Sequence, residues 1–332
     1  MTTLLELKEK LVHFYGKNEV YITPIIRFLL AFASFLMINA NIGYMERIST
    51  MPIALLLALV CSVLPIGATV LAGSVLILID LYALSLEVCL VGLLLFVLIY
   101  FLYFRFSPKH EYNIILTPLC FGVHIPYLIP VATGLLKEMY SLFSLICGTV
   151  LFFFLDGVKQ NQAALGAAEE AEEGTSKIVV ALNQLVGNRE MYLVLGIMVA
   201  AAIIVYLIRR MSIEHAWTVA IISGILFQAI GLIAGYMLLG IAGKTVEVLI
   251  GCVISCAVAF VLQFLFFNLD YSRTERLQFE DDEYYYYVKA VPKAIVSGTE
   301  KKVTRFGGKE KGERMTRKRF AEEMDIDEDL LD

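Results

Sequence analysis

Charged residues are scarce in most of this 332-residue chain, which contains only 27 lysines and arginines and 32 aspartates and glutamates. Of these, 13 basic and 16 acidic residues follow Asn268, so residues 1–268 are still more apolar than the whole chain. The mean hydropathy of +0.75 is far above that of a soluble globular protein. This composition excludes an ordinary cytosolic enzyme and predicts an all-α polytopic membrane protein with a charged C-terminal tail.

Motifs for catalysis, nucleotide binding and metal binding are also absent. The six cysteines stand in apolar runs and form no CxxC pair, which argues against a zinc site or a disulfide framework. The FGGK run at 306–309 lacks the spaced first glycine and the Ser/Thr of a P-loop, and no HExxH, GxSxG or GxGxxG motif occurs. The net charge of −5 argues against a nucleic-acid partner. We therefore expect no enzyme activity, no cofactor and no metal site.

Hydropathy divides the chain into five regions. In the first, residues 1–22, Leu4, Leu7 and Leu11 share one helical face while lysines and glutamates lie elsewhere, a pattern typical of an amphipathic helix at the membrane interface. The other regions are a membrane region (23–157), an external acidic loop (158–190), a membrane region of three helices (191–268) and a cytoplasmic tail (269–332).

The first membrane region contains two stretches of similar organisation, 49–106 and 113–157. Pro65 in the first and Pro126 in the second are each followed eight residues later by a glycine. Each stretch divides into three apolar segments, so consecutive copies would enter the membrane from opposite sides. This pattern indicates an inverted repeat of the kind found in transporters. The alternative is that apolar sequences containing prolines align by chance.

About ten helical segments are expected, some of them short or re-entrant. Outside the tail, nine basic residues fall on the side of the N-terminus and five on the opposite side. The positive-inside rule then places both termini in the cytoplasm. Whether 49–64 and 113–136 cross the membrane or re-enter stays open from the sequence.

Ionisable residues inside apolar segments are costly and are therefore candidate functional residues. Asp80 lies near the end of its segment, and Glu87 follows seven residues later. His124 stands beside Pro126, where a titratable ring and freed backbone carbonyls could line a polar cavity. We predict these three acidic or basic side chains as substrate-pathway residues. The alternatives are an interfacial position for Asp80 and a hydrogen-bonded packing role for His124.

Two features concern packing and the tail. Gly231 and Gly235 form a GxxxG pair, which lets helices approach closely in a membrane. In the tail, the aromatic run at 284–288 favours a β-strand. A basic block further on could contact anionic lipid headgroups or a cytosolic partner, although a solvated, disordered tail is the alternative; its residues are Arg314, Arg317, Lys318 and Arg319.

Three segments carry a resemblance to a known group of proteins. LYALS at 81–85, FRFSP at 104–108 and the tail junction from Asp270 to Lys293 resemble uncharacterised multi-spanning membrane proteins of clostridia, which are often labelled ABC transporter permeases. The resemblance extends over most of the chain. It implies a bacterial plasma membrane, a permease-like subunit and a separate ATPase, and it assigns no site residues.

The leading hypothesis is a permease-like transmembrane subunit of a transport system whose substrate the sequence does not identify. Its expected partners are the lipid bilayer, a cytosolic protein on the tail and further copies of the chain. The alternative is a membrane scaffold for cell-envelope or division machinery that acts through the tail. A membrane enzyme is the least favoured class, because acid, base and metal-binding residues do not cluster.

Overall fold

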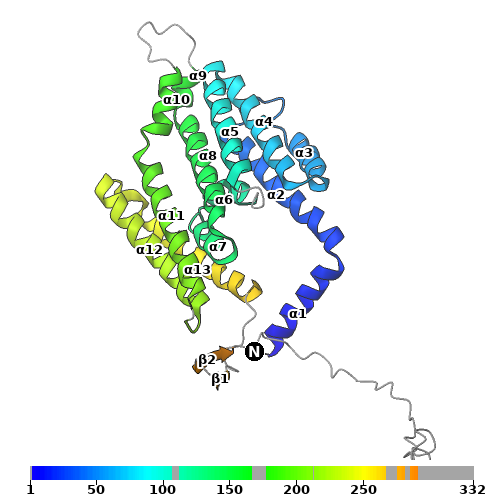
Figure 1. The fold of residues 1–332 in the computed structure, drawn as a ribbon. Helices are drawn as coiled ribbons and strands as arrows, with labels where there is room; N and C mark the ends of the chain where they lie inside the picture. Colours follow the sequence, from blue (N-terminus) through cyan, green and yellow to red (C-terminus); the bar gives the residue numbers. More distant parts are fainter. Residues whose placement is uncertain are drawn as a thin grey trace, which may run out of the picture.

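The structure, a computed structural model, describes residues 2–106, 112–166, 177–211, 213–266, 275–280 and 285–290. Within these ranges the chain forms helices and one β-hairpin (Figure 1). The elements are α1 (Thr2–Lys17), α2 (Glu19–Ile42), α3 (Met51–Val63), α4 (Ile66–Leu84), α5 (Leu86–Phe106), α6 (Tyr112–Gly122), α7 (Leu128–Leu136), η1 (Met139–Ser141), α8 (Leu142–Gln160), α9 (Gln162–Gly166), α10 (Lys177–Val186), α11 (Arg189–Arg210), α12 (Ala216–Leu239), η2 (Ala242–Lys244), α13 (Thr245–Phe266), β1 (Glu275–Glu280) and β2 (Tyr285–Ala290).

Among the described residues, seven helices are long and apolar enough to cross a membrane: α2, α4, α5, α8 with η1, α11, α12 and α13. Many of their apolar side chains face outward; Leu238 of α12 is 89% exposed and Leu94 of α5 is 65% exposed. The chain is therefore an integral membrane protein with a helical membrane part. The expected count of about ten segments is not confirmed, because α3 and α6 fall below the length of a span.

α3 folds back along α2. Near the start of α2, the guanidinium of Arg27 donates to the carbonyl of Leu64, which follows α3, at 3.2 Å. Beyond the end of α2, the amide of Met45 donates to the carboxylate of Asp80 near the end of α4 at 3.1 Å. Leu64 precedes a proline and is extended, the conformation that proline favours in its neighbour, so α3 ends there. α2 and α4 therefore run in the same direction, with α3 antiparallel to both.

α6 and α7 form a helical hairpin. The side-chain amide of Asn113 in α6 donates to the hydroxyl of Thr133 in α7 at 3.2 Å. With 11 and 9 residues, the two helices rise about 17 and 14 Å, and each is too short to cross a hydrocarbon core of about 30 Å alone. The segment 113–136 thus returns to the side from which it starts. α8 then runs parallel to α6, with Gly148 packed against Thr117.

The helices of 49–106 and of 113–157 run in opposite directions along the bundle. α5 is antiparallel to α8, since Gly92 near the start of α5 lies 3.6 Å from the ring of Phe154 near the end of α8, measured from a Cβ placed on the glycine. Such directions are compatible with an inverted repeat. The repeat itself stays a prediction.

α8 lies at the centre of the bundle. Of its apolar window 61% is buried, against 44% or less in the other six long helices. Phe153 belongs to the core shared with α7, α11, α12 and α13, whereas Leu151 and Phe154 belong to the core shared with α4 and α5. Figure 1 shows α8 between these two groups of helices.

α11, α12 and α13 alternate in direction. Gly235 of α12 lies directly against Leu193 of α11, and a Cβ on Gly231 would lie 3.4 Å from Ile197. The predicted GxxxG pair thus faces α11. α13 pairs with α12 through the side-chain amide of Gln263, which donates to Thr218 at 2.9 Å.

The remaining elements lie around the bundle. α1 is amphipathic and joins α2; its Lys8 ammonium lies 5.5 Å from the ring of Phe264 at the end of α13. α10 packs on α5 and α8, with Ala181 2% exposed. In the tail, β1 and β2 pair antiparallel, Glu275 opposite Ala290, as the aromatic run predicted. The acidic run at 169–173 and the basic block of the tail lie outside the described residues.

Gly134 provides a test of the contact between α7 and α11. A Cβ at this position would lie 2.7 Å from Cβ of Val205 and 2.8 Å from the carbonyl oxygen of Ala202, and the backbone atom cannot rotate away. Gly134→Ala should therefore lower the free energy of unfolding by about 1–3 kcal/mol, measured as a lower unfolding temperature in detergent. Gly196→Ala is the control, since no atom lies within 4 Å of that Cβ. Equal stability of the two variants would contradict the packing.

Candidate functional site

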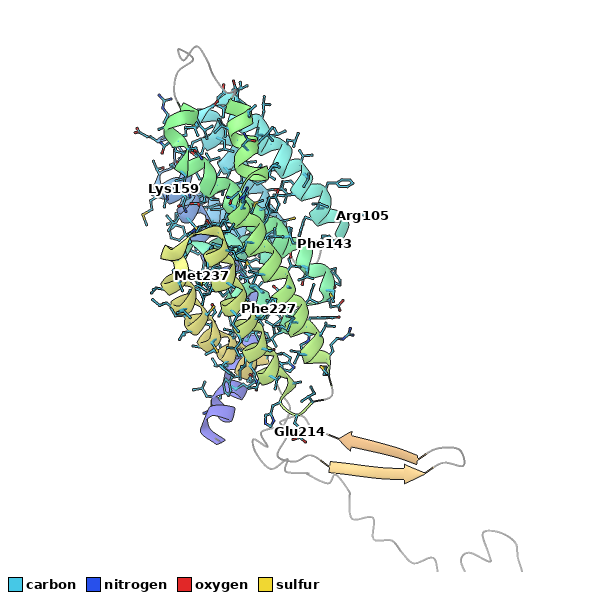
Figure 2. All side chains as sticks on the ribbon, turned by 90° about the vertical axis from the view of Figure 1, so that its left-hand side faces the viewer. Arg105, Phe143, Lys159, Glu214, Phe227 and Met237 are labelled. Carbon is cyan, nitrogen blue, oxygen red and sulfur yellow. The ribbon has the colours of Figure 1, made fainter. Side chains whose placement is uncertain are left out.

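A polar cavity lies where α8, α11, α12 and α13 meet the turn between α6 and α7. It consists of two adjoining hollows of about 290 and 370 Å³. Both are lined by Phe153, Asp156, Gln160 and Glu190. The cavity lies at the end of the helices where α8 ends and α11 begins; in Figure 2, Lys159 marks this end, and Glu214 lies at the opposite end of α12.

Glu190 is the most connected side chain of the polar cavity. Its Oε1 accepts a hydrogen bond from the hydroxyl of Tyr236 at 3.2 Å and forms a short ion pair with Lys244. The Lys244 ammonium also lies 5.9 Å from the Tyr236 ring. Glu190 stands in the first turn of α11, where the helix dipole stabilises a carboxylate. The three residues thus join the adjacent ends of α11 and α12 across the cavity wall.

The turn between α6 and α7 has a conformation that histidine rarely adopts. His124 has φ of 62°, in the left-handed region that favours glycine. The backbone amide of His124 donates to the carbonyl of Phe121 at 3.1 Å, and the backbone amide of Ile125 donates to the carbonyl of Cys120 at 2.8 Å. This is the hydrogen-bond pattern of a Schellman helix end. A glycine would make this turn without strain, and His215 is the other non-glycine residue with a positive φ within the described part of the chain.

The imidazole of His124 reaches across the polar cavity to α13. Its Nδ1 lies 2.7 Å from Oε1 of Glu247, and the two side chains are 75% and 50% exposed. Glu247 stands in the first turn of α13, where a carboxylate is again favoured. Tyr127 follows in the same turn and packs against Gly251, whose added Cβ would lie 2.6 Å from the Tyr127 ring. The hairpin tip is therefore tied to α13 by one polar and one aromatic contact.

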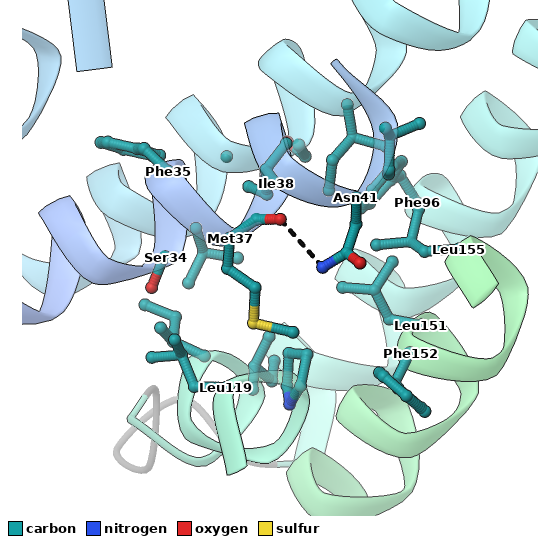
Figure 3. Close-up of a pocket in the computed structure, with 18 of the residues that line it drawn as sticks. Ser34, Phe35, Met37, Ile38, Asn41, Phe96, Leu119, Leu151, Phe152 and Leu155 are labelled. Carbon is teal, nitrogen blue, oxygen red and sulfur yellow. Dashed lines mark hydrogen bonds between the residues drawn. The ribbon is translucent and has the colours of Figure 1, made fainter. Parts of the chain in front are cut away.

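A second cavity, the apolar cavity, lies between α2, α4, α5, α6 and α8. It has a volume of about 100 Å³ and is lined mainly by aliphatic and aromatic side chains, among them Phe35, Ile38, Leu151 and Phe152 (Figure 3). Its polar wall residues include Ser34, Asn41, Thr69, Ser74 and Tyr100.

Asp156 borders the polar cavity and the apolar cavity at once. It stands in the last turns of α8, where the helix dipole disfavours a carboxylate, and it accepts a hydrogen bond from Gln160 at 2.7 Å. Three residues later, the Lys159 ammonium donates to Asn41 at 2.8 Å. Asp156 is half-buried, and an ionisable side chain inside a membrane helix is a candidate functional residue.

The structure does not bring the three predicted pathway residues together. Asp80 is 2% exposed and accepts hydrogen bonds from the amide of Met45 and the hydroxyl of Ser49 at 3.1 and 3.3 Å, so it holds the loop between α2 and α3. Glu87 stands in the first turn of α5. Neither lines the polar or the apolar cavity. Only His124 does so.

Tyr44 lies in the loop that Asp80 contacts, and its pKa is affected by this surrounding. Burial, and secondly the nearby charge of Asp80, raise the pKa of Tyr44, which precedes Met45 in this loop. Asp80 is thus joined to this loop by its hydrogen bonds with Met45 and Ser49 and by its charge. The glycines Gly231 and Gly235 likewise contribute packing, and the predicted lipid or partner contacts Arg314, Arg317, Lys318 and Arg319 lie outside the described residues.

Sequence reasoning missed most of the polar cavity. Asp156, Glu190 and Glu247 each lie within four residues of a helix end. A charged residue at such a position is ordinarily solvated, so the sequence alone does not mark it as a functional residue. In the sequence, Lys244 is only one of the five basic residues predicted on the side opposite the N-terminus. Their association depends on the packing of helices that are distant in the sequence. Within the described residues no group of three His, Cys, Asp or Glu side chains could hold a metal ion.

Comparisons with protein-family models, with curated proteins and with solved structures find no match for the chain. The two cavities and the hairpin tip are the features of the described residues that bear on function.

His124 can be tested by separating its backbone from its imidazole. His124→Gly should keep the free energy of unfolding within about 1 kcal/mol of the wild type, because relief of left-handed strain offsets the loss of an exposed ion pair. His124→Ala loses the pair and keeps the strain, so it should be less stable than His124→Gly by about 1 kcal/mol. Unfolding temperatures of the two variants give this order, and the reverse order would refute the strained turn.

Proposed function

We propose that the protein is a permease-like transmembrane subunit of a transport system, with the solute pathway running through the polar cavity. The observation that carries the proposal is a charged cavity that opens at one end of the lipid-facing helices and is bordered on one side by the tip of the hairpin of α6 and α7. Broken helices beside ionisable groups are the usual form of a transport site.

The residues of the polar cavity suit the binding of a polar solute. The paired groups Glu190 with Lys244 and Glu247 with His124 can exchange their mutual contacts for contacts with a solute, so that desolvation is compensated. Asp156 offers a further carboxylate at the passage toward the apolar cavity. Movement of the hairpin tip relative to α13 would open or close this passage.

The distribution of basic residues supports a cytoplasmic position for both termini in a bacterial plasma membrane. Arg105, at the end of α5, and Arg209 and Arg210, at the end of α11, belong to helices that run toward the side of the N-terminus. Lys159 and Lys244 stand at the opposite end. The excess on the first side agrees with the positive-inside rule.

Cysteine labelling tests this orientation. In a background without the six native cysteines, a cysteine at Lys137 should react with a membrane-impermeant maleimide only after the cells are opened. A cysteine at Arg47 should react in intact cells. Labelling of the Lys137 position from outside would reverse the proposed orientation.

Transport can be tested without knowledge of the energy source. The purified full-length protein is screened against amino acids, peptides, sugars and small cations for solutes that raise its unfolding temperature. Exchange of labelled for unlabelled solute is then measured in proteoliposomes. Asp156→Asn and Lys244→Met should lower the exchange rate at least tenfold (about 1.4 kcal/mol in the barrier), because each removes a charge from the polar cavity.

Asp80→Asn is the matched control for these variants. It keeps an oxygen that accepts from Met45 and changes no residue of either cavity, so exchange should persist. If no solute that binds the protein exchanges faster than in liposomes without protein, the result would count against a permease. So would Asp156→Asn with full activity.

A second candidate function is a membrane scaffold for cell-envelope or division machinery, acting through the tail. The observation that favours it is the β-hairpin of β1 and β2, whose outer edges can accept a further strand. Affinity purification of the full-length protein, compared with a chain lacking residues 277–332, would separate the candidates. A co-purified ATPase favours the permease, and an envelope-synthesis protein lost with the tail favours the scaffold.

A further inference from the structure

We infer that Phe121 and Phe152 form a hydrophobic gate between the polar cavity and the apolar cavity. The inference rests on the proposed transport function and names the residues that control passage within the same site. It starts from one geometric fact, which is that Phe152 lines both cavities.

The two rings form a stacked pair in the wall of the polar cavity, and Phe152 also borders the apolar cavity. Phe121 of α6 and Phe152 of α8 are stacked with centroids 4.4 Å apart and an interplanar angle of 17°. Phe153 packs edge-on against both, at centroid distances of 5.8 and 5.6 Å. Three rings without polar atoms thus meet beside Asp156, which borders both cavities. Water and charged solutes are excluded from an apolar constriction of this kind, which can therefore gate by dewetting.

The two rings are carried by different types of element. Phe152 lies in the middle of α8, the most buried of the long helices, and is fixed with it. Phe121 is the penultimate residue of α6 and lies three residues before the strained His124. A shift of the hairpin tip would therefore move Phe121 while Phe152 stays in place.

Contacts on both sides determine the position of the hairpin tip. Gly122 lies directly against the side chain of Met37 of α2. On the other side, His124 contacts Glu247 of α13 at 2.7 Å. A solute that competes for Glu247 in the polar cavity would release one of these two attachments. Occupancy of the polar cavity is thereby coupled to the position of Phe121.

The experiment measures access to the apolar cavity. Ser74 lines that cavity and is 5% exposed, and Gln160 lines the polar cavity. In the full-length chain without native cysteines, Ser74→Cys or Gln160→Cys is reconstituted in liposomes and treated with a charged, membrane-impermeant methanethiosulfonate. Gln160→Cys reports how much protein faces the reagent and shows that the polar cavity is folded.

With both rings intact, Ser74→Cys should react at least a hundredfold more slowly than Gln160→Cys. Phe121→Ala or Phe152→Ala should raise the rate at Ser74→Cys at least tenfold, and Phe121→Leu, which retains apolar bulk, should raise it less. Phe143→Ala is the matched control, because this phenylalanine of α8 lines neither cavity and is 36% exposed (Figure 2). It should leave the rate unchanged.

Rapid reaction of Ser74→Cys with both rings intact would overturn the gate. So would an unchanged rate in Phe121→Ala and Phe152→Ala chains whose Gln160→Cys reaction is normal. Labelling requires no transported solute, so the outcome is independent of the exchange assay. Accelerated labelling without solute exchange would retain the gate and reject the permease, whereas exchange with unaffected labelling would do the reverse.

Discussion

The requirement that buried backbone groups be hydrogen-bonded determines where this chain can interrupt a helix. Hydrocarbon offers no partner to a free amide or carbonyl, so a break is tolerated only inside protein or beside a water-filled cavity. The break between α6 and α7 meets this requirement. It closes α6 with its own backbone hydrogen bonds at His124 and Ile125, and it lies against α2, α8 and α13. The polar cavity lies beside this tip, which lines it with His124, Pro126 and Tyr127.

The central position of α8 follows from the same arrangement. Two of the three hydrophobic cores of the described residues are joined through α8, whose Phe153 belongs to one core and whose Phe154 belongs to the other. Asp156 stands one turn beyond Phe152 on this helix. Any movement between the two groups of helices would therefore be expressed at the aromatic contact and at Asp156. The proposed pathway and the proposed gate depend on this one helix.

The charged contacts of the polar cavity contribute little to stability. His124 and Glu247 are 75% and 50% exposed, and exposed pairs contribute only about 0–1 kcal/mol. Glu190 is less exposed and is bound by two donors, so loss of Lys244 would leave a carboxylate with one hydrogen bond. Contacts of moderate strength can be exchanged for contacts with a solute. A tightly buried pair could not be opened at such low cost.

The sequence by itself determined that the chain is a helical membrane protein and that its apolar stretch 113–136 is interrupted. Composition and hydropathy suffice for this because the hydrocarbon core acts on each segment separately. The helices α3, α4 and α5 form the three segments predicted for 49–106, and most of the aromatic run of the tail lies in β2. Of the predicted pathway residues, only His124 lines a cavity.

Only the tertiary structure decided that Asp80 holds a loop and that Asp156, Glu190, Lys244 and Glu247 share a cavity. These four residues stand at the ends of different helices, where each alone looks like an ordinary interfacial charge. Their proximity depends on how α8, α11, α12 and α13 pack, and helix packing in a membrane depends on the fit of small side chains rather than on hydrophobicity. Such fit between distant segments leaves no periodic pattern in a single sequence.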